Sequence, residues 1–405
     1  MPLLDPAAMA PDLRAKAEKI QSWQHSAATF IYDPSVALAR IQLMRTALPP
    51  WIRIHYAMKA NSFPSLVEVI SPKVDGFDVA SESELETARR VSATASISAS
   101  GPGKSDAFIE CLSRISNSIV NVDSVTELHR LRKVAENHGR QQKVALRVSP
   151  PYVQLDIGDE FENDGQRFGL FSDDLHHAIT YARASSFLEL VGFHFHLLSN
   201  NLDAARHASY IRWCLSWSRS TAQRAGIDLR YVNVGGGIGV GFGIESEFDL
   251  ERLGNELKGL ETPDFEVVIE PGRYLTADCG WYISDVVDLK VREHESFVVL
   301  AGGIHHFQLP TSWDIVHNAV VLPREGWSET YPRPTVENQL VTIIGKLCTT
   351  EDTLLRDVAV TRVRVGDAIA FPYAGAYGWE FAMQNFLGHP HAKRALLRSN
   401  DIGDD

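Results

Sequence analysis

Residues 52–100 have the sequence IRIHYAMKANSFPSLVEVISPKVDGFDVASESELETARRVSATASISAS, and this stretch indicates the fold. Its short apolar runs have the length of β-strands; they are Ile52–Met58, Gly76–Ala80 and Ala95–Ala99. The segments between them have helical spacing of apolar residues. One helix is expected to begin near Pro64, a residue suited to a first helical turn, and another to cover Glu82–Val91. The stretch is therefore strand, helix, strand, helix, strand.

The same alternation continues along the chain. Further strands are predicted at Ser118–Val122, Lys143–Val148, Leu190–Phe195, Tyr231–Val234 and Glu266–Ile269. Further helices are predicted after the capping-box pattern Ser124–Glu127 and at Ser172–Ala184, Asp203–Ala225 and Glu245–Leu260. Eight strands alternating with helices predict an α/β fold, a closed parallel (β/α)8 barrel. A doubly wound open sheet is the alternative, because it is built from the same repeats.

After about residue 280 the helical segments become scarce, which indicates a second, mostly β domain. Its predicted strands are Trp281–Val291, Phe297–Ala301, Leu340–Ile344, Val358–Val360 and Ala368–Tyr373. The early run Thr29–Tyr32 is a candidate to join them, and residues 310–334 are expected to form a long loop. We therefore predict a barrel over residues 30–280, with residues 1–29 and 281–405 in the β-rich domain.

The composition is that of a globular protein. The chain has 405 residues, of which 44% are hydrophobic and 22% charged, and its formal net charge is -12. Such acidity disfavours binding to nucleic acid or to an anionic membrane. No run reaches the length of a membrane span, and Met1–Asp5 do not begin a signal peptide. The cysteines, Cys111, Cys214, Cys279 and Cys348, are scattered, so we expect no disulfide framework and a cytoplasmic location.

Chemistry-bearing side chains follow the predicted strands. In a β/α barrel the active site lies at the carboxyl ends of the strands. The residues there are Lys59, Ser81, Gly101–Lys104, Asp123, Arg147, His196, Gly235–Gly237 and Glu270. One amine, two carboxylates, an imidazole, a guanidinium and a glycine-rich turn would thus meet at one end of the barrel.

Each of these residues has a functional and a structural interpretation. The backbone amides of Gly235–Gly237 could bind a phosphate, or the glycines could simply form a turn. Lys59 could form a Schiff base, or it could be a solvated lysine at the barrel rim. Glu270 could keep a pyridine nitrogen protonated, and Arg273 could pair with a phosphate; the alternative is a structural ion pair.

The run Phe193-His194-Phe195-His196 places both histidines on one face of a strand. No third ligand has a convincing spacing in the sequence, so we expect no metal. A ring stacked on a flat cofactor suits His196 better. His194 could instead be a hydrogen-bonded core histidine.

Several motifs occur together in one order along the chain. They are Tyr56–Asn61, Gly76–Ser81, Gly101–Lys104, His194–His196, Gly235–Gly237, Glu270–Arg273, Cys348 and Gly375–Gly378. In this order they resemble the fold-type III decarboxylases that depend on pyridoxal 5'-phosphate (PLP), the group of ornithine, arginine and diaminopimelate decarboxylases. The resemblance covers about residues 30–390.

This resemblance implies a role for each matching residue. Lys59 would hold PLP covalently, His196 would stack on it, and Glu270 would face its ring nitrogen. The phosphate contacts implied are Ser199, Gly236, Gly237, Arg273 and Tyr377, with Asp78 and Arg147 also near the cofactor. Cys348 would be the acid that protonates Cα after CO2 leaves, supplied across the interface of a homodimer.

Positions at which this chain differs from the family pattern indicate which substrate it takes. Ornithine and diaminopimelate decarboxylases have an acidic residue after the cysteine, whereas this chain has Thr349, although Asp352 could partly substitute. Leu198 also stands where glycine is commoner. Residues 194–203, 235–240, 302–313, 373–379 and 386–391 most resemble siderophore-pathway decarboxylases, which convert citryl-diaminopropionate to citryl-ethylenediamine in staphyloferrin B biosynthesis.

A substrate with a tail rich in carboxylates requires hydrogen-bond donors. The candidates are His305, His306, Gln308, Ser312 and Thr349, although the His-His pair could instead support a turn of the β domain. Two other activities remain open: a decarboxylase of diaminopimelate or ornithine type, and a non-catalytic PLP-binding relative. A racemase fits less well, because Cys348 and Gly375–Gly378 match the decarboxylase branch.

Overall fold

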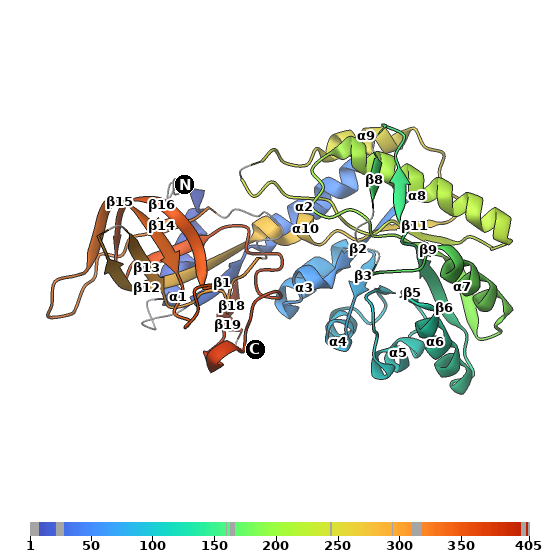
Figure 1. The fold of residues 1–405 in the computed structure, drawn as a ribbon, viewed down its shortest axis with the longest axis horizontal. Coiled ribbons are helices and arrows are strands. Elements are labelled where there is room, and N and C mark those ends of the chain that lie inside the picture. Colours follow the sequence, from blue (N-terminus) through green and yellow to red (C-terminus); the bar gives the residue numbers. More distant parts are fainter. Residues whose placement is uncertain are drawn as a thin grey trace. The chain divides into compact units, whose positions relative to one another are not determined.

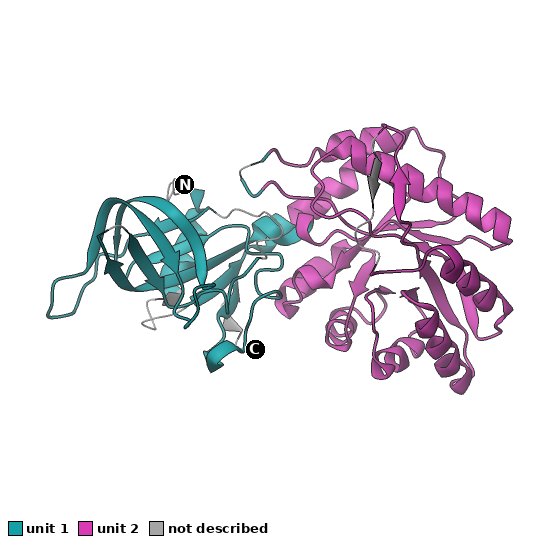
Figure 2. Cartoon of the chain, viewed as in Figure 1, with its two compact units in different colours: residues 1–37, 242–245, 275–405 teal, residues 38–241, 246–274 magenta. Residues whose placement is uncertain are grey.

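The computed structural model divides into two compact units, shown in different colours in Figure 2. The barrel unit comprises residues 38–241 and 246–274, and the β unit comprises residues 1–37, 242–245 and 275–405. The structure describes residues 8–21, 28–158, 160–162, 167–243, 245–293, 295–309, 318–397 and 402–403.

The barrel unit contains a closed ring of parallel strands, several of which are labelled in Figure 1. The ring runs β2 (Ile52–Ala57), β3 (Gly76–Val79), β4 (Ser96–Ala99), β5 (Ser118–Val122), β6 (Gln142–Arg147), β9 (Leu188–His194), β10 (Tyr231–Asn233) and β11 (Glu266–Ile269), and then returns to β2. Each neighbouring pair is parallel. The predicted barrel is therefore confirmed, and the open sheet is excluded.

Helices connect the barrel strands. They are α2 (Pro34–Ala47), α3 (Pro64–Ile70), α4 (Glu82–Val91), α5 (Asp106–Ser113), α6 (Val125–Asn137), α7 (Ser172–Ala184), α8 (Ala204–Ala225), α9 (Leu250–Lys258) and the short α10 (Arg273–Thr276). Serine side chains cap three of them at the N-terminus, and the predicted cap at Ser124 is confirmed, since its side chain accepts a hydrogen bond from the Glu127 amide.

Two details differ from the sequence prediction. The helix predicted at Glu245–Leu260 begins only at Leu250, because Asp249 caps it by accepting a hydrogen bond from the Arg252 amide. In addition, the connection between β6 and α7 carries a small hairpin of β7 (Tyr152–Gln154) and β8 (Glu160–Glu162) that periodicity did not indicate.

The β unit contains a nine-stranded sheet. Its strands are β1 (Ala28–Tyr32), β12 (Gly280–Val291), β13 (Ser296–Leu300), β14 (Val320–Leu322), β15 (Thr335–Ile344), β16 (Thr353–Arg364), β17 (Ala368–Phe371), β18 (Lys393–Leu396) and β19 (Ile402–Gly403). The early run does join this sheet: β1 pairs antiparallel with β12 and parallel with β18.

Of the segment 310–334, expected to be a long loop or a partly irregular insertion, residues 310–317 lie outside the described residues. Val320–Leu322 form β14, so the loop prediction was wrong over those three residues. This run of three apolar residues pairs with β17 and packs in the core beside Ile283 and Ala370. A strand this short has no visible alternation in the sequence. The same holds for β18 and β19, which the sequence also did not indicate. Helix α1 (Pro11–Gln21) places Leu13 in the same core.

Among the described residues, no helix is long and apolar enough to cross a membrane.

A tight contact between helices offers a test of the barrel wall. A Cβ added to Gly254 in α9 would lie 2.0 Å from the carbonyl oxygen of Ala47 at the end of α2. Gly254→Ala should therefore lower the free energy of unfolding by about 1–3 kcal/mol, the usual cost of overpacking, in urea denaturation.

The matched control is Gly259→Ala at the end of the same helix. A Cβ at Gly259 meets no atom within 4 Å, so the change should stay within about 0.5 kcal/mol of the wild-type value. Equal stability of the two variants would contradict the contact between α9 and α2.

Candidate active site

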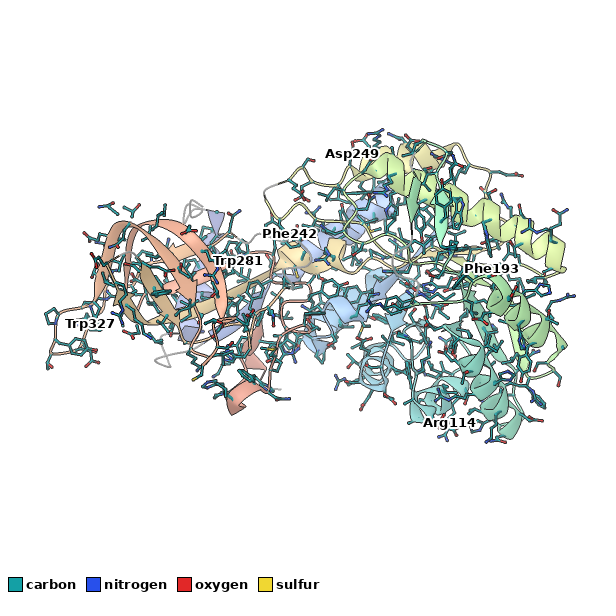
Figure 3. All side chains as sticks on the ribbon, viewed as in Figure 1. Arg114, Phe193, Phe242, Asp249, Trp281 and Trp327 are labelled. Carbon is teal, nitrogen blue, oxygen red and sulfur yellow. The ribbon has the colours of Figure 1, made fainter. Side chains whose placement is uncertain are left out.

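Strand alternation decides which side chains enter the barrel. Phe193 of β9, labelled in Figure 3, and Phe195 contact Trp217 of α8 edge-on, with ring centroids 5.1 and 5.6 Å apart. These phenylalanines therefore face the helices. The residues between and after them, His194 and His196, face the barrel interior.

The interior has an apolar layer and a polar layer. The apolar layer contains Ala145, Val191, Tyr231 and Val268, with Ile119 packed against it. The polar layer lies at the carboxyl ends of the strands and contains Asp78, Ser98, Asn121, His194, Asn233 and Glu270, each less than 3% exposed. An active site at this end of the barrel agrees with the general rule for the fold.

Glu270 is the centre of the polar layer. Its Oε1 accepts hydrogen bonds from Ser98 Oγ at 2.8 Å and from Asn233 Nδ2 at 2.5 Å. Its Oε2 lies 3.5 Å from His194 Nε2. Burial alone would raise the pKa of Glu270, but His194 beside it and the charge of Lys59 outweigh burial and lower it. Glu270 is therefore an ionised carboxylate inside the barrel.

Asp78 lies beside Glu270 in the opposite state. Its Oδ1 accepts a hydrogen bond from Ser100 Oγ at 2.7 Å and lies 3.3 Å from Ser98 Oγ, the hydroxyl that donates to Glu270. Burial and the charge of Glu270 raise the pKa of Asp78 well above its ordinary value. Two carboxyl groups joined through Ser98 thus hold different charges, a pattern common in active sites.

Lys59 is brought to the same end of the barrel by the turn Met58–Ala60, which follows β2. Gly272 makes the close approach possible, because a Cβ there would lie 2.8 Å from Ala60 Cβ and 3.2 Å from Ala57 Cβ. The segment after Glu270 therefore rests directly on the Lys59 turn. Lys59 is partly buried, and its charge affects the pKa of both Glu270 and His196.

The glycine turn after β10 lies against His196. The Gly236 amide donates to His196 Nδ1 at 3.3 Å, so the proton of the neutral ring is on Nε2. Burial, Lys59 and Arg147 lower the pKa of His196 well below its ordinary value, so the ring is neutral. A Cβ at Gly236 would lie 2.5 Å from the Glu270 carbonyl oxygen. Gly237 has φ +95°, which only glycine adopts readily.

These features fit PLP. Glu270 Oε2 has no hydrogen-bond partner among the described residues, although it is buried, and a protonated ring nitrogen would provide one. A Cβ at any of Gly235–Gly237 would collide with neighbouring backbone, so this turn is bare backbone, the kind of segment whose amides can bind a phosphate. Arg273 follows two residues after Pro271 and is 8% exposed. A lysine amine, a buried carboxylate oxygen whose described neighbour is His194 Nε2 at 3.5 Å, and a turn of bare backbone thus occur together.

The same residues have the geometry of a metal site. One ligand atom from each of His194, His196 and Glu270 lies within 4.8 Å of the others. This third ligand was not visible in the sequence, because Glu270 lies far from the histidines in the chain. However, the charges of Lys59 and Arg147 oppose a cation here, as they oppose a proton on His196. The absence of a metal stays a prediction.

Other strand-end residues have structural partners. Arg147 Nη1 lies 3.0 Å from Asp123 Oδ1, and its guanidinium covers the ring of Phe168. Lys104 is buried and forms hydrogen bonds to the Gly101 and Asn121 carbonyls and to Glu127 Oε1. Ser81 caps α4.

The loop after β9 packs on the glycine turn. The carbonyl oxygen of Leu198 in this loop lies 2.5 Å from where a Gly237 Cβ would be. Ser199 follows in this loop and is exposed. The roles of Ser199, Asp78 and Arg147 toward the cofactor stay predictions.

The remaining predicted site residues lie in the β unit. Cys348 is exposed and lies between β15 and β16. Tyr377 is partly buried and has φ +63°, a strained conformation for an aromatic residue that indicates a tightly determined turn. Thr349 and Gln308 are partly buried, whereas Ser312 lies outside the described residues.

The carboxylate of Asp352 is hydrogen-bonded to the backbone of the β unit. It is 2% exposed, and its two carboxylate oxygens accept hydrogen bonds from the Ile304 and Leu347 amides, each at 2.8 Å. A carboxylate so engaged supports a turn and does not present itself to a substrate amine. The acidic group that the sequence left open as a substitute at this position is therefore structural.

His305 and His306 are buried in the β unit, with rings 3.9 Å apart. His306 Nδ1 lies 3.3 Å from the Tyr282 hydroxyl, and Nε2 lies 2.8 Å from the Pro390 carbonyl oxygen. These contacts match the supporting role that the sequence left open. Burial, His306, Lys346 and His389 lower the pKa of His305 to about 3. A substrate contact of either histidine stays a prediction.

Sequence reasoning missed the polar groups that surround the two carboxylates. They are Ser98, Ser100, Asn121 and Asn233. A signal was present, because a polar side chain interrupts each short apolar strand at an inward-facing position, as in Val120-Asn121-Val122 and Val232-Asn233-Val234. The prediction rested on the residue after each strand, and most of these polar residues lie one or two positions earlier.

Known proteins resemble this chain over most of its length. Residues 36–277 match the pyridoxal-binding domain of pyridoxal-dependent decarboxylases. A Staphylococcus aureus decarboxylase is 30% identical over 387 residues, which cover 94% of this chain and 96% of that protein. Its substrate is 2-hydroxybutanedioate that carries an (L-alanin-3-ylcarbamoyl)methyl group at C2.

Two further relatives have different substrates. The L-glutamyl-acyl-carrier-protein decarboxylase of Niallia circulans is 28% identical, over 91% of this chain and 88% of that protein. The crystal structure of diaminopimelate decarboxylase from Helicobacter pylori complexed with L-lysine has a TM-score of 0.78 and 26% identity, and covers 96% of this chain and 95% of that one.

The neutral state of Asp78 can be tested through the pH dependence of stability. The folded chain holds a proton on Asp78 that the unfolded chain releases above the ordinary pKa of 3.8. The contribution of Asp78 to the free energy of unfolding should therefore fall as pH rises above that value. The amide of Asp78→Asn does not titrate, so this variant should gain stability relative to the wild type in urea denaturation as the pH is raised from about 4.5 to about 8.

Asp228→Asn, with a side chain 86% exposed, is the surface control for a lost carboxylate. A stability difference between Asp78→Asn and the wild type that stays constant over this pH range would show that Asp78 is ionised.

Proposed function

Because this chain belongs to the pyridoxal-dependent decarboxylases, we propose that it decarboxylates an amino acid whose side chain carries a citryl group. The substrate of the S. aureus relative is such a compound: citrate joined through an amide to the side-chain amine of 2,3-diaminopropionate. The product would be citryl-ethylenediamine. The reaction breaks the bond between Cα and the α-carboxylate and releases CO2.

The residues of the barrel unit have distinct roles in this proposal. Lys59 would carry PLP covalently until the amine of the substrate replaces it. Glu270, as an ionised carboxylate, would hold the ring nitrogen protonated, and the neutral His196 ring would stack on the face of the ring. When bound, PLP supplies an electron-poor ring that accepts the electron pair released as CO2 leaves.

The phosphate would be held by a backbone amide and by one cation. Gly237 would offer its amide and Arg273 the cation, while Gly236, whose amide donates to His196 Nδ1, would border the phosphate without a side chain. The exposed Ser199 and the strained Tyr377 would add hydroxyl groups. Asp78 and the pair of Arg147 with Asp123 would keep the surrounding charges fixed.

The proton that replaces CO2 on Cα would come from Cys348. It is one of two exposed cysteines, the other being Cys111 in α5. A thiol is a suitable general acid for this step, because it can donate its proton to Cα. We further propose that the protein is a homodimer in which this thiol serves the barrel of the partner subunit.

The single observation that supports the choice of substrate is that both carboxylate oxygens of Asp352 accept hydrogen bonds from backbone amides. With Thr349 neutral and both Asp352 oxygens bound to backbone amides, the segment after Cys348 offers no buried carboxylate for a distal ammonium group. The distal ammonium group of a free diamino acid would therefore have no buried carboxylate to pair with in this segment. A carboxylate-rich tail needs none, and Thr349 and Gln308, both partly buried, have hydrogen-bond donors to give it.

A diamino acid decarboxylase is the second candidate. The fold of the H. pylori enzyme, whose structure was determined with L-lysine, favours it. Glu351 is exposed, and it is the acidic side chain near Cys348 that a distal amine would require in this case.

The experiment is to measure CO2 release from citryl-diaminopropionate, ornithine, lysine and diaminopimelate by the PLP-loaded protein. Release from the citryl compound alone is expected. Lys59→Ala is the control that separates enzymatic from spontaneous loss. Release only from a free diamino acid would reject the proposed substrate, and that activity should then fall with Glu351→Gln. No release from any of the four would reject the proposed activity.

A further inference from the structure

The loops that carry His196 and the glycine turn are joined by backbone bonds at two places. At the strand ends, the Phe195 amide donates to the Asn233 carbonyl at 2.8 Å. Further along, the Asn201 amide donates to the Gly237 carbonyl, also at 2.8 Å. The stretch between these ties contains His196 on one loop and Gly236 on the other.

A tyrosine hydroxyl from α8 lies between the two loops within this stretch. The Leu197 amide donates to the hydroxyl oxygen of Tyr210 at 3.3 Å, and the same hydroxyl donates to the Val234 carbonyl at 3.1 Å. Leu197 follows His196, and Val234 precedes the glycine turn. One hydroxyl group thus links the two loops as both acceptor and donor.

Tyr210 is fixed in this position. Its side chain is fully buried, and it lies in the second turn of a 22-residue helix. Burial raises the pKa of the Tyr210 phenol well above its ordinary value, so the hydroxyl keeps the proton that it donates to Val234. The helix therefore sets how far apart the two loops lie.

Within the same stretch, the Gly236 amide donates to His196 Nδ1 at 3.3 Å. This bond fixes the orientation and tautomer of the ring. It can form only while His196 and Gly236 are held at the correct separation, which is the separation that Tyr210 bridges. The structure therefore assigns to Tyr210 the role of a positioning residue, which sets the His196 imidazole and the glycine turn relative to each other. This inference rests on the proposed function for the identity of the bound group.

The test is Tyr210→Phe, which removes the hydroxyl group and leaves the ring. The Leu197 amide and the Val234 carbonyl then lose their partner, and buried polar groups without partners disfavour the arrangement. We expect the dissociation constant of PLP, measured by fluorescence titration, to rise about tenfold, or about 1.4 kcal/mol. We also expect kcat to fall more than KM changes, because the substrate tail is not touched.

A spectroscopic readout separates positioning from a general loss of stability. In the wild type, the ¹⁵N signals of His196 should show Nδ1 as acceptor and Nε2 as protonated. In Tyr210→Phe, the two nitrogens should move toward a mixture of tautomers. Tyr282→Phe is the control, since it removes another fully buried hydroxyl, one that contacts His306 Nδ1 in the β unit. It should leave the PLP dissociation constant at the wild-type value.

Wild-type PLP affinity in Tyr210→Phe, with an unchanged His196 tautomer, would overturn the inference. If that variant does not fold, hydrogen exchange in the wild type decides. Protection of the Leu197 amide comparable to that of Phe195 supports the bridge, and exchange at the rate of a free amide overturns it. Failure of the wild type to bind PLP would reject the proposed function instead, and hydrogen exchange would still test the bridge.

Discussion

A charged carboxylate inside the barrel is the constraint on which the site depends. An ionised Glu270 in a buried position is costly unless hydrogen bonds and opposite charge compensate it. Ser98 and Asn233 provide the hydrogen bonds, and Lys59 provides the charge. The neutral state of Asp78 follows from the same constraint, because a second negative charge beside the first would be unfavourable.

This constraint also explains the backbone around Glu270. The Lys59 turn must approach closely enough for its charge to act, and Gly272 permits this by leaving no Cβ between it and Ala60. The glycine turn must pass over the Glu270 carbonyl, where only a residue without a side chain fits. These glycines are thus required by close approaches around one carboxylate. In the β unit, by comparison, Asp352 and His306 use their polar atoms to hold backbone and turns in place.

The barrel itself could be predicted closely from the sequence. The strands β5 and β11 and the helices α4 and α7 have the predicted limits, because their apolar runs are bounded by turn and capping residues. The β unit was harder, since β14 and β18 are three or four residues long and gain their stability from pairing with β17 and β1. No local pattern marks a strand whose partners lie far away in the chain.

Part of the site could likewise be predicted from the sequence and part could not. The residues after the strands were found because the fold fixes where strands end. The hydrogen-bond network that sets their charges could not be predicted, because Ser98 and Asn233 contact Glu270 only once the barrel has closed. The hydrogen bonds from the Ile304 and Leu347 amides to Asp352 could not be predicted either, since these two partners belong to different segments.

The central claim is that the end of the barrel that contains Glu270 and the glycine turn holds PLP through Lys59. The most direct measurement is borohydride reduction of the PLP-loaded protein, followed by digestion and mass spectrometry of the peptides. The account predicts that the added mass of reduced PLP lies on the peptide that contains Lys59, and that Lys59→Arg gives no such peptide. Reduced PLP on a different lysine, with Lys59 unmodified, would contradict it.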